Sequence, residues 1–322
     1  MKKLSIFILT IIFSLTFTSC KTLKLYKLSD TYFIMDTTCT ITAGGADKTN
    51  LEEAIRKAFD KVYEIESYTD YYSNKSDVSR VNLAKANQGT VVSDDTINIL
   101  QTALDVCEKS RGAFDITIAP LKDIWGFKNE VHTLPSSENI SSSLSLVDYK
   151  NIHIDAENKL VIKETDNTKI DLGGCAKGYA ADKALEILKE HNVSYALIDF
   201  GGNILTYGKN PSNSNGKWTI GIQKPFSKNG EFSNTLSVEN KAVVTSGTYQ
   251  RYFEYDGKIY HHILDSSTGH PADKGIQSAT IISDNALLAD CLSTAAVVLG
   301  KDEAEKLIKE YNSDFYIIDD KN

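Results

Sequence analysis

Two neighbouring glycines, Gly173 and Gly174, separate segments of different periodicity. Residues 169–172 have the composition of a short strand. Beyond the glycines, apolar residues recur at helical spacing: Ala181, Ala184, Leu185 and Leu188. The pattern predicts a strand, a tight turn and a helix, and the rest of the fold has to be built around this unit.

The start of this helix has the features of an anion-binding site. A helix that begins directly after two glycines presents unpaired backbone N–H groups, and the positive end of its dipole, to whatever lies over the turn. Lys177 adds a positive charge in the first turn. This favours a phosphorylated ligand, although neither GxGxxG nor GxxxxGKS/T is present, which argues against a Rossmann or Walker site. The alternative is a helix that only packs tightly on its strand through the glycines.

The first residues have the pattern of an export signal. A basic start precedes an apolar stretch at 4–17 and then Cys20, and this resembles the lipobox of bacterial lipoproteins, apart from Phe17 where leucine is usual. We therefore expect a lipoprotein signal peptide at 1–19, a lipidated Cys20, a tether at 20–30 and an extracytoplasmic protein held to the membrane by its lipid only. The alternatives are an ordinary cleaved signal or a short anchor helix.

Charge and cysteine spacing exclude two further classes of function. The formal net charge of −8 argues against a nucleic-acid partner held through phosphate contacts. The four cysteines beyond Cys20 are far apart and form no CxxC pair, so we do not expect a zinc or redox motif. We expect single buried thiols, although an exported protein could also pair them. They are Cys39, Cys107, Cys175 and Cys291.

The first half of the chain mixes helical and strand patterns. The expected elements are, in order, one or two strands at 31–43, a helix capped by Asn50, a polar loop at 70–82, a helix capped by Ser93 and ended by Gly112, an extended segment at 113–121, a mobile serine-rich loop at 130–145 and a hairpin at 152–162. In the extended segment, Asp115 and Thr117 would share one face.

The second half is richer in strands and hairpins. Asp256-Gly257 lies between two β-rich runs and is typical of a type I′ turn, so it predicts a hairpin over 249–264. A helix is expected at 285–299. Because strands and helices do not alternate regularly, the pattern favours an α+β fold over a doubly wound sheet. It predicts one large domain, or two intimate subdomains, over 31–322.

The helix at 286–299 is apolar on nearly all sides and is expected to be buried. Its polar residues, Asp290, Ser293 and Thr294, form one narrow stripe. A buried lone carboxylate is unfavourable unless it is paired or binds a metal, and oxygen ligands from Asp and Thr suit Mg²⁺. The alternative is that the hydroxyls bond back to their own helix and that Asp290 pairs with a lysine.

Three of the six histidines lie within residues 260–271. In a strand, His261 and His262 would point to opposite faces. A histidine near an aspartate, here Asp265, is a candidate general base. A structural role for the histidine pair is the alternative.

Taken together and in order, these segments are similar to the ApbE family, the FAD:protein FMN transferases of bacteria. The resemblance covers nearly the whole mature chain, and many family members are lipoproteins. It rests on residues 35–38, 76–82, 112–117, 171–180, 201–203 and 245–247, on the run from His262 to Asp265 with Thr268, Gly269 and Pro271, and on Ala289, Asp290 and Thr294.

The resemblance implies an ApbE-like, T-fold-like arrangement of mixed antiparallel sheets with packed helices. It implies one Mg²⁺-dependent reaction, in which FAD is split at its pyrophosphate, AMP leaves, and FMN is joined through a phosphoester to Thr or Ser of an exported electron-transfer flavoprotein. If water replaces the hydroxyl, the enzyme is an FAD pyrophosphatase. A third alternative is a lipoprotein that binds FAD without turnover.

The resemblance also assigns residues by position. The carbonyl of Ala176 and the side chains of Asp290 and Thr294 would hold Mg²⁺. His262 would be the base that activates the acceptor hydroxyl, and Asp265 would orient it. The FAD site would be lined by Met35, Tyr72, Ala113, Phe114, Asp115, Gly173, Lys177, Tyr179 and Ile263.

The chain departs from the family pattern at two places. Asp70 and Tyr71 stand where small polar residues usually precede Tyr72, so contacts to the flavin ring are expected to differ there. Cys175 replaces a usual aliphatic residue and is expected only to pack. The chain has no Asp-Gly-x-Ser/Thr-Gly-Ala acceptor motif of its own, so attachment of FMN to this chain is not expected.

Overall fold

The computed structural model describes residues 25–129, 131–227 and 230–320. The expected signal peptide at 1–19 and the lipidated Cys20 lie outside these residues, as does the first part of the expected tether. Within the described part of the chain, no helix combines the length and the apolar character needed to cross a membrane.

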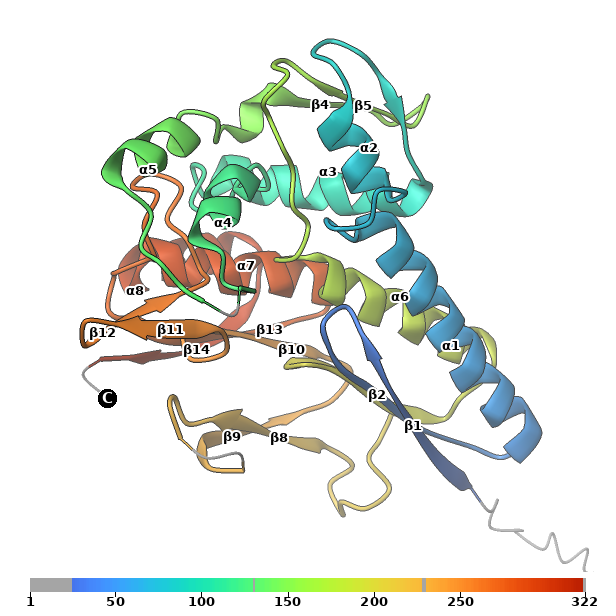
Figure 1. Cartoon of the computed structure of the whole chain (residues 1–322). Coiled ribbons are helices and arrows are strands. Elements are labelled where there is room, and N and C mark those ends of the chain that lie inside the picture. Colours follow the sequence, from blue (N-terminus) through green and yellow to red (C-terminus); the bar gives the residue numbers. More distant parts are fainter. Residues whose placement is uncertain (1–24, 130, 228–229, 321–322) are drawn as a thin grey trace, which may run out of the picture.

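A seven-stranded sheet runs through the molecule, in the order β1-β2-β6-β7-β10-β13-β14 (Figure 1). All of its neighbouring strands are antiparallel. The strands are β1 (Tyr26–Ile34), β2 (Thr37–Gly45), β6 (Tyr195–Phe200), β7 (Asn203–Tyr207), β10 (Ala242–Gly247), β13 (Ile276–Ser283) and β14 (Asp314–Asp319).

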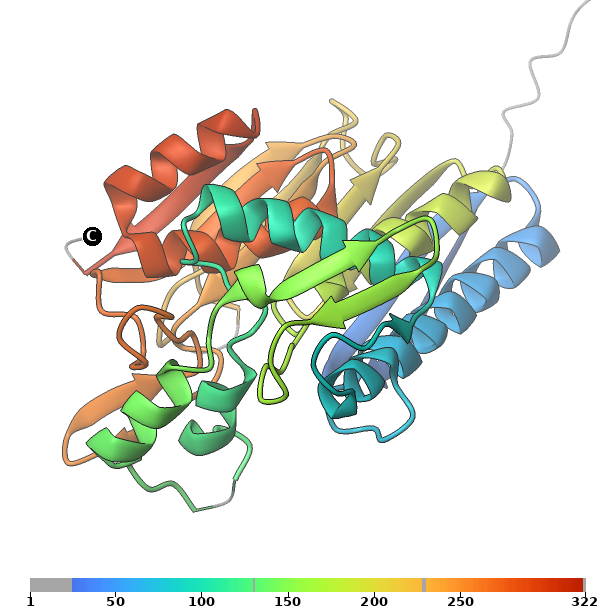
Figure 2. The ribbon, with the colours of Figure 1, turned by 90° about the horizontal axis from the view of Figure 1, so that it is seen from above.

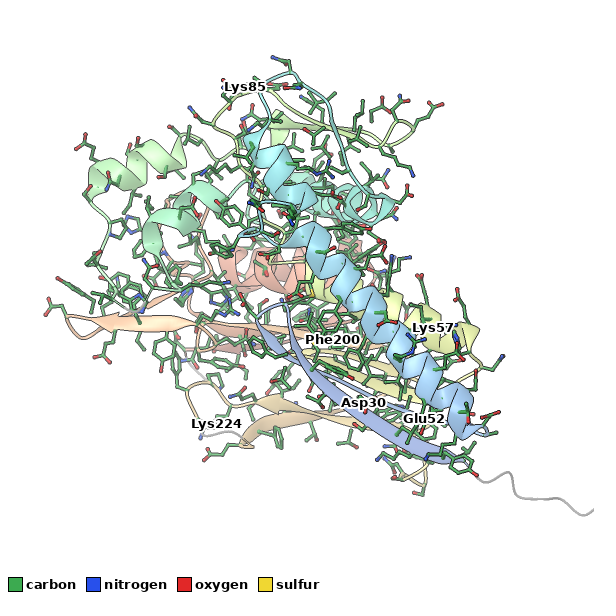
Figure 3. The ribbon with its side chains drawn as sticks, turned by 45° about the vertical axis from the view of Figure 1, so that its right-hand side comes forward. Asp30, Glu52, Lys57, Lys85, Phe200 and Lys224 are labelled. Carbon is green, nitrogen blue, oxygen red and sulfur yellow. The ribbon has the colours of Figure 1, made fainter. Side chains whose placement is uncertain are left out.

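The long helices lie on one side of this sheet (Figures 1 and 2). α7 contacts β10, β13, α6 and α3, and this burial on several sides explains why its sequence is apolar almost all round. Figure 3 shows Glu52 and Lys57 on the outer side of α1, with Phe200 in the core beneath it. The helices are α1 (Lys48–Thr69), α3 (Asp94–Lys109), α6 (Ala176–Glu190), α7 (Ala286–Leu299) and α8 (Lys301–Glu310).

The hairpin of β8 (Trp218–Gln223) and β9 (Phe232–Val238) covers the opposite face of the main sheet (Figure 1). Its inward side chains form a second apolar cluster with residues of the sheet. The buried members of this cluster are Trp218, Ile220 and Ile222 from β8, and Tyr195, Val243 and Ile318 from the main sheet.

A small unit beside the helices consists of α2 (Asp77–Leu83), the 3₁₀ helix η1 (Tyr149–Asn151) and a three-stranded sheet in the order β3-β5-β4. Lys163 on β5 is only 1% exposed. Its ammonium donates to three backbone carbonyls, those of Asn82, Asp166 and Thr168, at 2.8, 2.9 and 3.1 Å. The three strands are β3 (Thr90–Val91), β4 (Ile152–Asp155) and β5 (Leu160–Lys163).

A second small unit is held together by aromatic side chains. Trp125 and Phe127 stack with ring centroids 6.0 Å apart, and Phe253 stacks on Tyr260 at 5.4 Å. This cluster joins four elements: α4 (Ala119–Trp125), α5 (Ser137–Leu144), β11 (Tyr252–Tyr255) and β12 (Lys258–His261).

The predicted α+β class, with antiparallel sheets and packed helices, is confirmed. The hairpins expected at 152–162 and 249–264 form as β4–β5 and β11–β12, and the helix expected at 285–299 forms as α7. The four described cysteines are free and buried, as expected of single thiols.

Two elements begin earlier than the sequence predicted. β1 begins at Tyr26, inside the expected tether at 20–30, because it pairs with β2 along its whole length. α1 has Asp47 rather than Asn50 as its N-cap. The Asn50 amide instead donates to the carbonyl of His191, at 2.6 Å.

Two segments predicted as loops contain helices. Ser76 caps α2 within the expected loop at 70–82, and Ser136 caps α5 within the expected mobile loop at 130–145. In both, the serine side chain accepts a hydrogen bond from the backbone N–H three residues later. Serine favours loops and helix N-caps alike, so a serine-rich composition alone could not separate the two.

The segment at 113–121 is not extended. The Asp115 carboxylate accepts hydrogen bonds from the N–H and the hydroxyl of Thr117, at 2.7 and 2.6 Å, and this closes a turn ahead of α4. Asp115 and Thr117 therefore do not share the face of a strand, because they lie in a turn.

The segment at 169–172 is not part of a sheet. The Asn82 side chain accepts from the N–H of Ile170 at 2.7 Å and donates to its carbonyl at 3.0 Å. A single amide side chain thus makes the two hydrogen bonds that a neighbouring strand would make. The helix expected after it forms as α6.

The contact between α6 and α7 depends on a glycine. A Cβ atom at Gly178 would lie only 2.2 Å from the carbonyl oxygen of Ala286. At the same junction the Asp182 carboxylate accepts hydrogen bonds from the first two N–H groups of α7, at Ala286 and Leu287. Burial raises the pKa of Asp182 to about 6. The two helices are therefore joined by close backbone contact and by a cap from one helix to the other.

We predict that Gly178→Ala destabilises the protein by about 1–3 kcal/mol, because the added methyl group meets backbone atoms rather than a flexible side chain. Urea unfolding followed by circular dichroism measures the change. Gly45→Ala is the matched control, since the nearest atom to its new Cβ would be Leu51 Cδ1 at 3.9 Å. Equal unfolding free energies for the two variants would contradict this role for Gly178.

Candidate active site

A pocket of about 920 Å³ lies among α6, α7, the turn between β1 and β2, and the segments that flank the β11–β12 hairpin. It brings together most of the residues predicted to bind flavin or metal. These are Met35, Tyr72, Ala113, Phe114, Asp115, Gly173, Ala176, Lys177, His262, Ile263, Asp290 and Thr294.

The N-terminus of α6 faces this pocket with free donors. Its N-cap, Cys175, makes no side-chain cap hydrogen bond. The N–H groups of Gly174 and Lys177 have no hydrogen-bond partner among the residues that the structure describes. The Lys177 ammonium lies 3.3 Å from the carbonyl oxygen of Gly173. This helix end therefore offers backbone donors, a helix dipole and a positive charge to an anion.

Asp290 on α7 is 3% exposed, and its donors all reach the same oxygen. Oδ2 accepts from the N–H of Gly178 at 3.0 Å and from the amide of Asn203 at 2.7 Å, and the Lys177 ammonium lies 3.8 Å away. Within the described part of the chain, no hydrogen-bond donor reaches Oδ1. Burial raises the pKa of Asp290 against the opposing effect of Lys177. A cation at Oδ1 would satisfy this oxygen.

The oxygens near Asp290 fit a hard cation such as Mg²⁺. Thr294 lies one turn further along α7, with its hydroxyl 3.2 Å from that of Ser246, and Ala176 is the first residue of α6. Among the described residues there is no group of three His, Cys, Asp or Glu side chains that could hold a metal ion. Mg²⁺ commonly binds through one or two carboxylates while water and substrate phosphates complete its shell, so one carboxylate with neutral oxygens suffices.

The turn between β1 and β2 forms another wall of the pocket. Met35 and Asp36 have φ angles of 54° and 59°, in the left-handed region that a tight hairpin turn requires. Neither is a glycine, and contacts hold both in place. The Met35 N–H donates to the Glu66 carboxylate at 2.6 Å, Lys128 pairs with the Asp36 carboxylate, and Arg251 donates to the Asp36 carbonyl at 3.2 Å. Lys128 also lowers the pKa of Asp36.

Two tyrosines and two lysines form an aromatic, cationic wall. The rings of Tyr71 and Tyr72 meet edge to face at 5.2 Å, and the Tyr71 hydroxyl donates to Asp123 at 2.8 Å. Tyr72 is 58% exposed, with the ammonium groups of Lys128 and Lys122 at 4.3 and 5.8 Å from its ring centroid. An exposed ring bordered by cations suits a planar aromatic ligand.

Phe114 lines the pocket close to the N-terminus of α6. A Cβ at Gly174 would lie 3.2 Å from its ring, so the glycine allows the helix N-terminus to approach it. The neighbouring Asp115 carboxylate accepts hydrogen bonds from Thr117 and, at 3.1 Å, from the N–H of Tyr149. Burial raises the pKa of Asp115.

His262 lies one residue beyond the end of β12 rather than inside the strand. Its N–H donates to the carbonyl of Arg251 at 3.0 Å, and its Nδ1 lies 3.1 Å from the same oxygen. Because a carbonyl only accepts, this contact assigns the ring proton to Nδ1 and leaves Nε2 as an acceptor. Burial, and then the charge of Arg251, lowers the pKa of His262 to about 3. The imidazole is therefore neutral over the physiological pH range.

Two residues predicted for the site do not line the pocket. The Asp265 carboxylate accepts from the N–H and hydroxyl of Ser267, at 2.7 and 2.6 Å, and the carbonyl of Arg251 takes the orienting role expected of Asp265. The Tyr179 hydroxyl donates to Asp95 on α3, at 2.8 Å. Residues two apart in a helix point about 200° apart, so Tyr179 turns away from the side on which Lys177 lies.

Sequence reasoning missed the cations Lys122, Lys128 and Arg251. Their segments have no periodicity or motif that marks them, and they reach the pocket only through the tertiary fold. Asn203 and Ser246 could have been found, because both lie in segments that resemble the family.

Known proteins resemble this chain over most of its length. Residues 35–317 match the family model described as the ApbE family. A protein from Klebsiella pneumoniae named FAD:protein FMN transferase is 35% identical over 226 residues, which cover 70% of this chain and 69% of that protein. One of the same name from Treponema pallidum is 30% identical over 269 residues, 80% of this chain and 74% of that protein.

Solved structures show the same fold. The ApbE protein from Thermotoga maritima has a TM-score of 0.82 and 32% identity, over 93% of this chain and 96% of that one. The flavin transferase ApbE from Vibrio cholerae has a TM-score of 0.79 and 25% identity, over 92% of this chain and 94% of that one. The match over most of the chain, the relatives and the shared fold agree: this chain belongs to the ApbE family.

Proposed function

We propose that this protein is an FAD:protein FMN transferase that joins FMN to a Ser or Thr hydroxyl of another protein, releases AMP and requires Mg²⁺. The relatives named FAD:protein FMN transferase support the transfer reaction. The observation that carries the proposal is that one pocket contains a helix N-terminus with free donors, a buried carboxylate with one free oxygen and a neutral histidine.

The pyrophosphate of FAD fits the N-terminus of α6. The free N–H groups of Gly174 and Lys177, with the Lys177 ammonium, would bind its oxygens and stabilise the negative charge that builds up as the bond breaks. The Ala176 carbonyl, the Asp290 carboxylate and the Thr294 hydroxyl would hold Mg²⁺. When bound, the metal would neutralise phosphate charge and polarise the phosphorus.

The flavin ring fits the aromatic side of the pocket. Met35, Tyr72, Phe114 and Ile263 offer apolar and aromatic contacts, with Tyr72 as the exposed ring. A pocket of about 920 Å³ is at the upper end of the range for small-molecule sites, as a dinucleotide requires.

His262 is suited to be the base. Its Nε2 would take the proton of the acceptor hydroxyl while the hydroxyl oxygen bonds to the phosphorus of the FMN half. The bond from that phosphorus to the bridging oxygen breaks, and the bridging oxygen leaves with AMP. If water replaces the hydroxyl, the same steps give free FMN and AMP, which is the pyrophosphatase alternative.

We propose that the protein acts outside the cytoplasm. The pattern of residues 1–20 supports a palmitoylated lipoprotein held outside the cytoplasm at Cys20. Its acceptors would then be exported flavoproteins of electron-transfer systems.

One experiment separates the three alternatives. The protein is incubated with FAD and Mg²⁺, with and without a peptide that carries Asp-Gly-x-Thr-Gly-Ala. AMP is followed by chromatography and covalent flavin by in-gel fluorescence. Mg²⁺-dependent labelling of the peptide supports the transferase. AMP and free FMN without labelling support the pyrophosphatase, and bound FAD without AMP supports the carrier.

We predict that Asp290→Asn abolishes AMP release, because the amide keeps the shape of the side chain but not the charge that would bind Mg²⁺. Asn203→Ala should raise the Mg²⁺ concentration needed for half-maximal rate by about 10- to 100-fold, because it removes one of the two hydrogen-bond donors that orient Asp290. Titration of Mg²⁺ against AMP release measures both effects. Circular dichroism checks that the variants fold, and wild-type AMP release by Asp290→Asn would refute the metal assignment.

We predict that His262→Ala slows peptide labelling more than it weakens FAD binding.

In the wild type, the labelling rate should stay flat as the pH falls from about 8 to about 5, because a pKa lowered to about 3 keeps the imidazole neutral. An ordinary histidine, with a pKa of about 6.5, would become protonated within this range. A rate that halves near pH 6.5 only when His262 is present would contradict the proposed state of the base.

A further inference from the structure

One side of β11 carries main-chain groups without a sheet partner. Its register pairs Tyr255 with Lys258 across a two-residue turn whose φ angles, 50° and 70°, are typical of type I′. That closing pair is hydrogen-bonded, and the antiparallel alternation then directs the N–H and C=O of Glu254 and Tyr252 away from β12. Within the described part of the chain, β12 is the only strand that pairs with β11.

The alternation of hydrogen-bonded and non-hydrogen-bonded pairs continues beyond β11 and β12 to the pocket. Arg251 and His262 form the next hydrogen-bonded pair, through the 3.0 Å contact between the His262 N–H and the Arg251 carbonyl. The two residues before Arg251, Tyr249 and Gln250, also line the pocket. The unpaired edge of β11 thus leads along the chain to the residue that holds the proposed base.

An exposed aromatic surface lies beside this edge. Tyr252 and Phe226 are 46% and 45% exposed, and their ring centroids lie 5.5 Å apart. Phe226 also contacts Tyr249, at 6.0 Å, so its ring lies between the edge strand and a pocket-lining residue. Exposed aromatic rings next to free main-chain donors and acceptors are typical of sites that bind an extended peptide.

We propose that the acceptor protein binds as an added strand on the free edge of β11, with an apolar side chain against Phe226 and Tyr252. The inference rests on the proposed transfer to a protein hydroxyl, because that hydroxyl has to reach His262 from outside the pocket. A strand laid along Glu254 and Tyr252 and continued past Arg251 delivers its next residues to the pocket. Main-chain pairing would hold the segment, and the aromatic pair would favour apolar residues in it.

Glu254→Pro tests the pairing. Proline removes the outward N–H at 254 and leaves the ladder to β12 intact, because residue 254 does not bond to β12. We expect labelling of the Asp-Gly-x-Thr-Gly-Ala peptide, at concentrations below its KM, to fall about tenfold. AMP release from FAD and water without peptide should stay at the wild-type rate. Glu254→Ala, which keeps the N–H, is the matched control and should label normally.

Tyr252→Ala tests the aromatic surface without touching the main chain. It should raise the KM for the peptide about tenfold and leave the KM for FAD unchanged. Tyr32→Ala is its control, because Tyr32 is also a half-exposed tyrosine (45%) on an edge strand, but of the main sheet. Equal KM values for the peptide in these two variants would overturn the aromatic contact.

Further outcomes decide whether the acceptor binds as an added strand on β11. The added strand is overturned if Glu254→Pro labels the peptide at the wild-type rate. It is also overturned if Glu254→Pro and Glu254→Ala lose equal amounts of labelling rate. The added strand is overturned too if the wild type forms dimers and Glu254→Pro is a monomer, since the free edge of β11 then pairs with a second copy of the chain. If neither the wild type nor any variant labels the peptide, the proposed transfer fails. Docking is then tested by the fluorescence anisotropy of a labelled peptide. Tighter binding by the wild type than by Glu254→Pro supports the docking surface, and equal binding overturns it.

Discussion

The close contact of α6 and α7 at Gly178 supports the rest of the site. Because position 178 has no side chain, its N–H reaches Asp290, and Asn203 on β7 reaches the same oxygen. Two neutral donors hold the carboxylate in an apolar helix, with the Lys177 ammonium 3.8 Å away, and its other oxygen remains open to the pocket. The same contact sets α7 beside the N-terminus of α6, so that the free N–H donors of α6 and the Asp290 carboxylate line one pocket.

Local sequence patterns predicted what local physics determines. The glycine pair and Lys177 indicated an anion site, and the polar stripe of α7 indicated a buried carboxylate with hydroxyls beside it. Both features line one pocket in the structure. Asp256-Gly257 also predicted its hairpin, because a type I′ turn depends on two residues only. Where one helix face or one turn decides the structure, the sequence sufficed.

The errors arose where a distant residue decides the outcome. Residues 169–172 remain outside the sheets because Asn82 satisfies them, and Asp265 lost its expected role because the carbonyl of Arg251 takes Nδ1 of His262. Arg251 itself was missed, although its backbone holds the histidine and its side chain holds the turn at Asp36. The partners are 88 residues apart for Asn82 and Ile170, 11 for Arg251 and His262, and 215 for Arg251 and Asp36, and a pattern within a short window does not show such contacts.

The place of α7 in the chain has a consequence for how the protein matures. This helix lies at the centre of the helical layer, yet it is formed by residues 286–299, after nearly all other elements have been synthesised. Its partners at Gly178 and Asn203 leave the ribosome about a hundred residues earlier and have to wait with their polar groups in water. Long-range contacts of this kind form late and slowly. A nascent or truncated chain that lacks α7 therefore has no complete pocket, and the site forms only when the protein is almost finished.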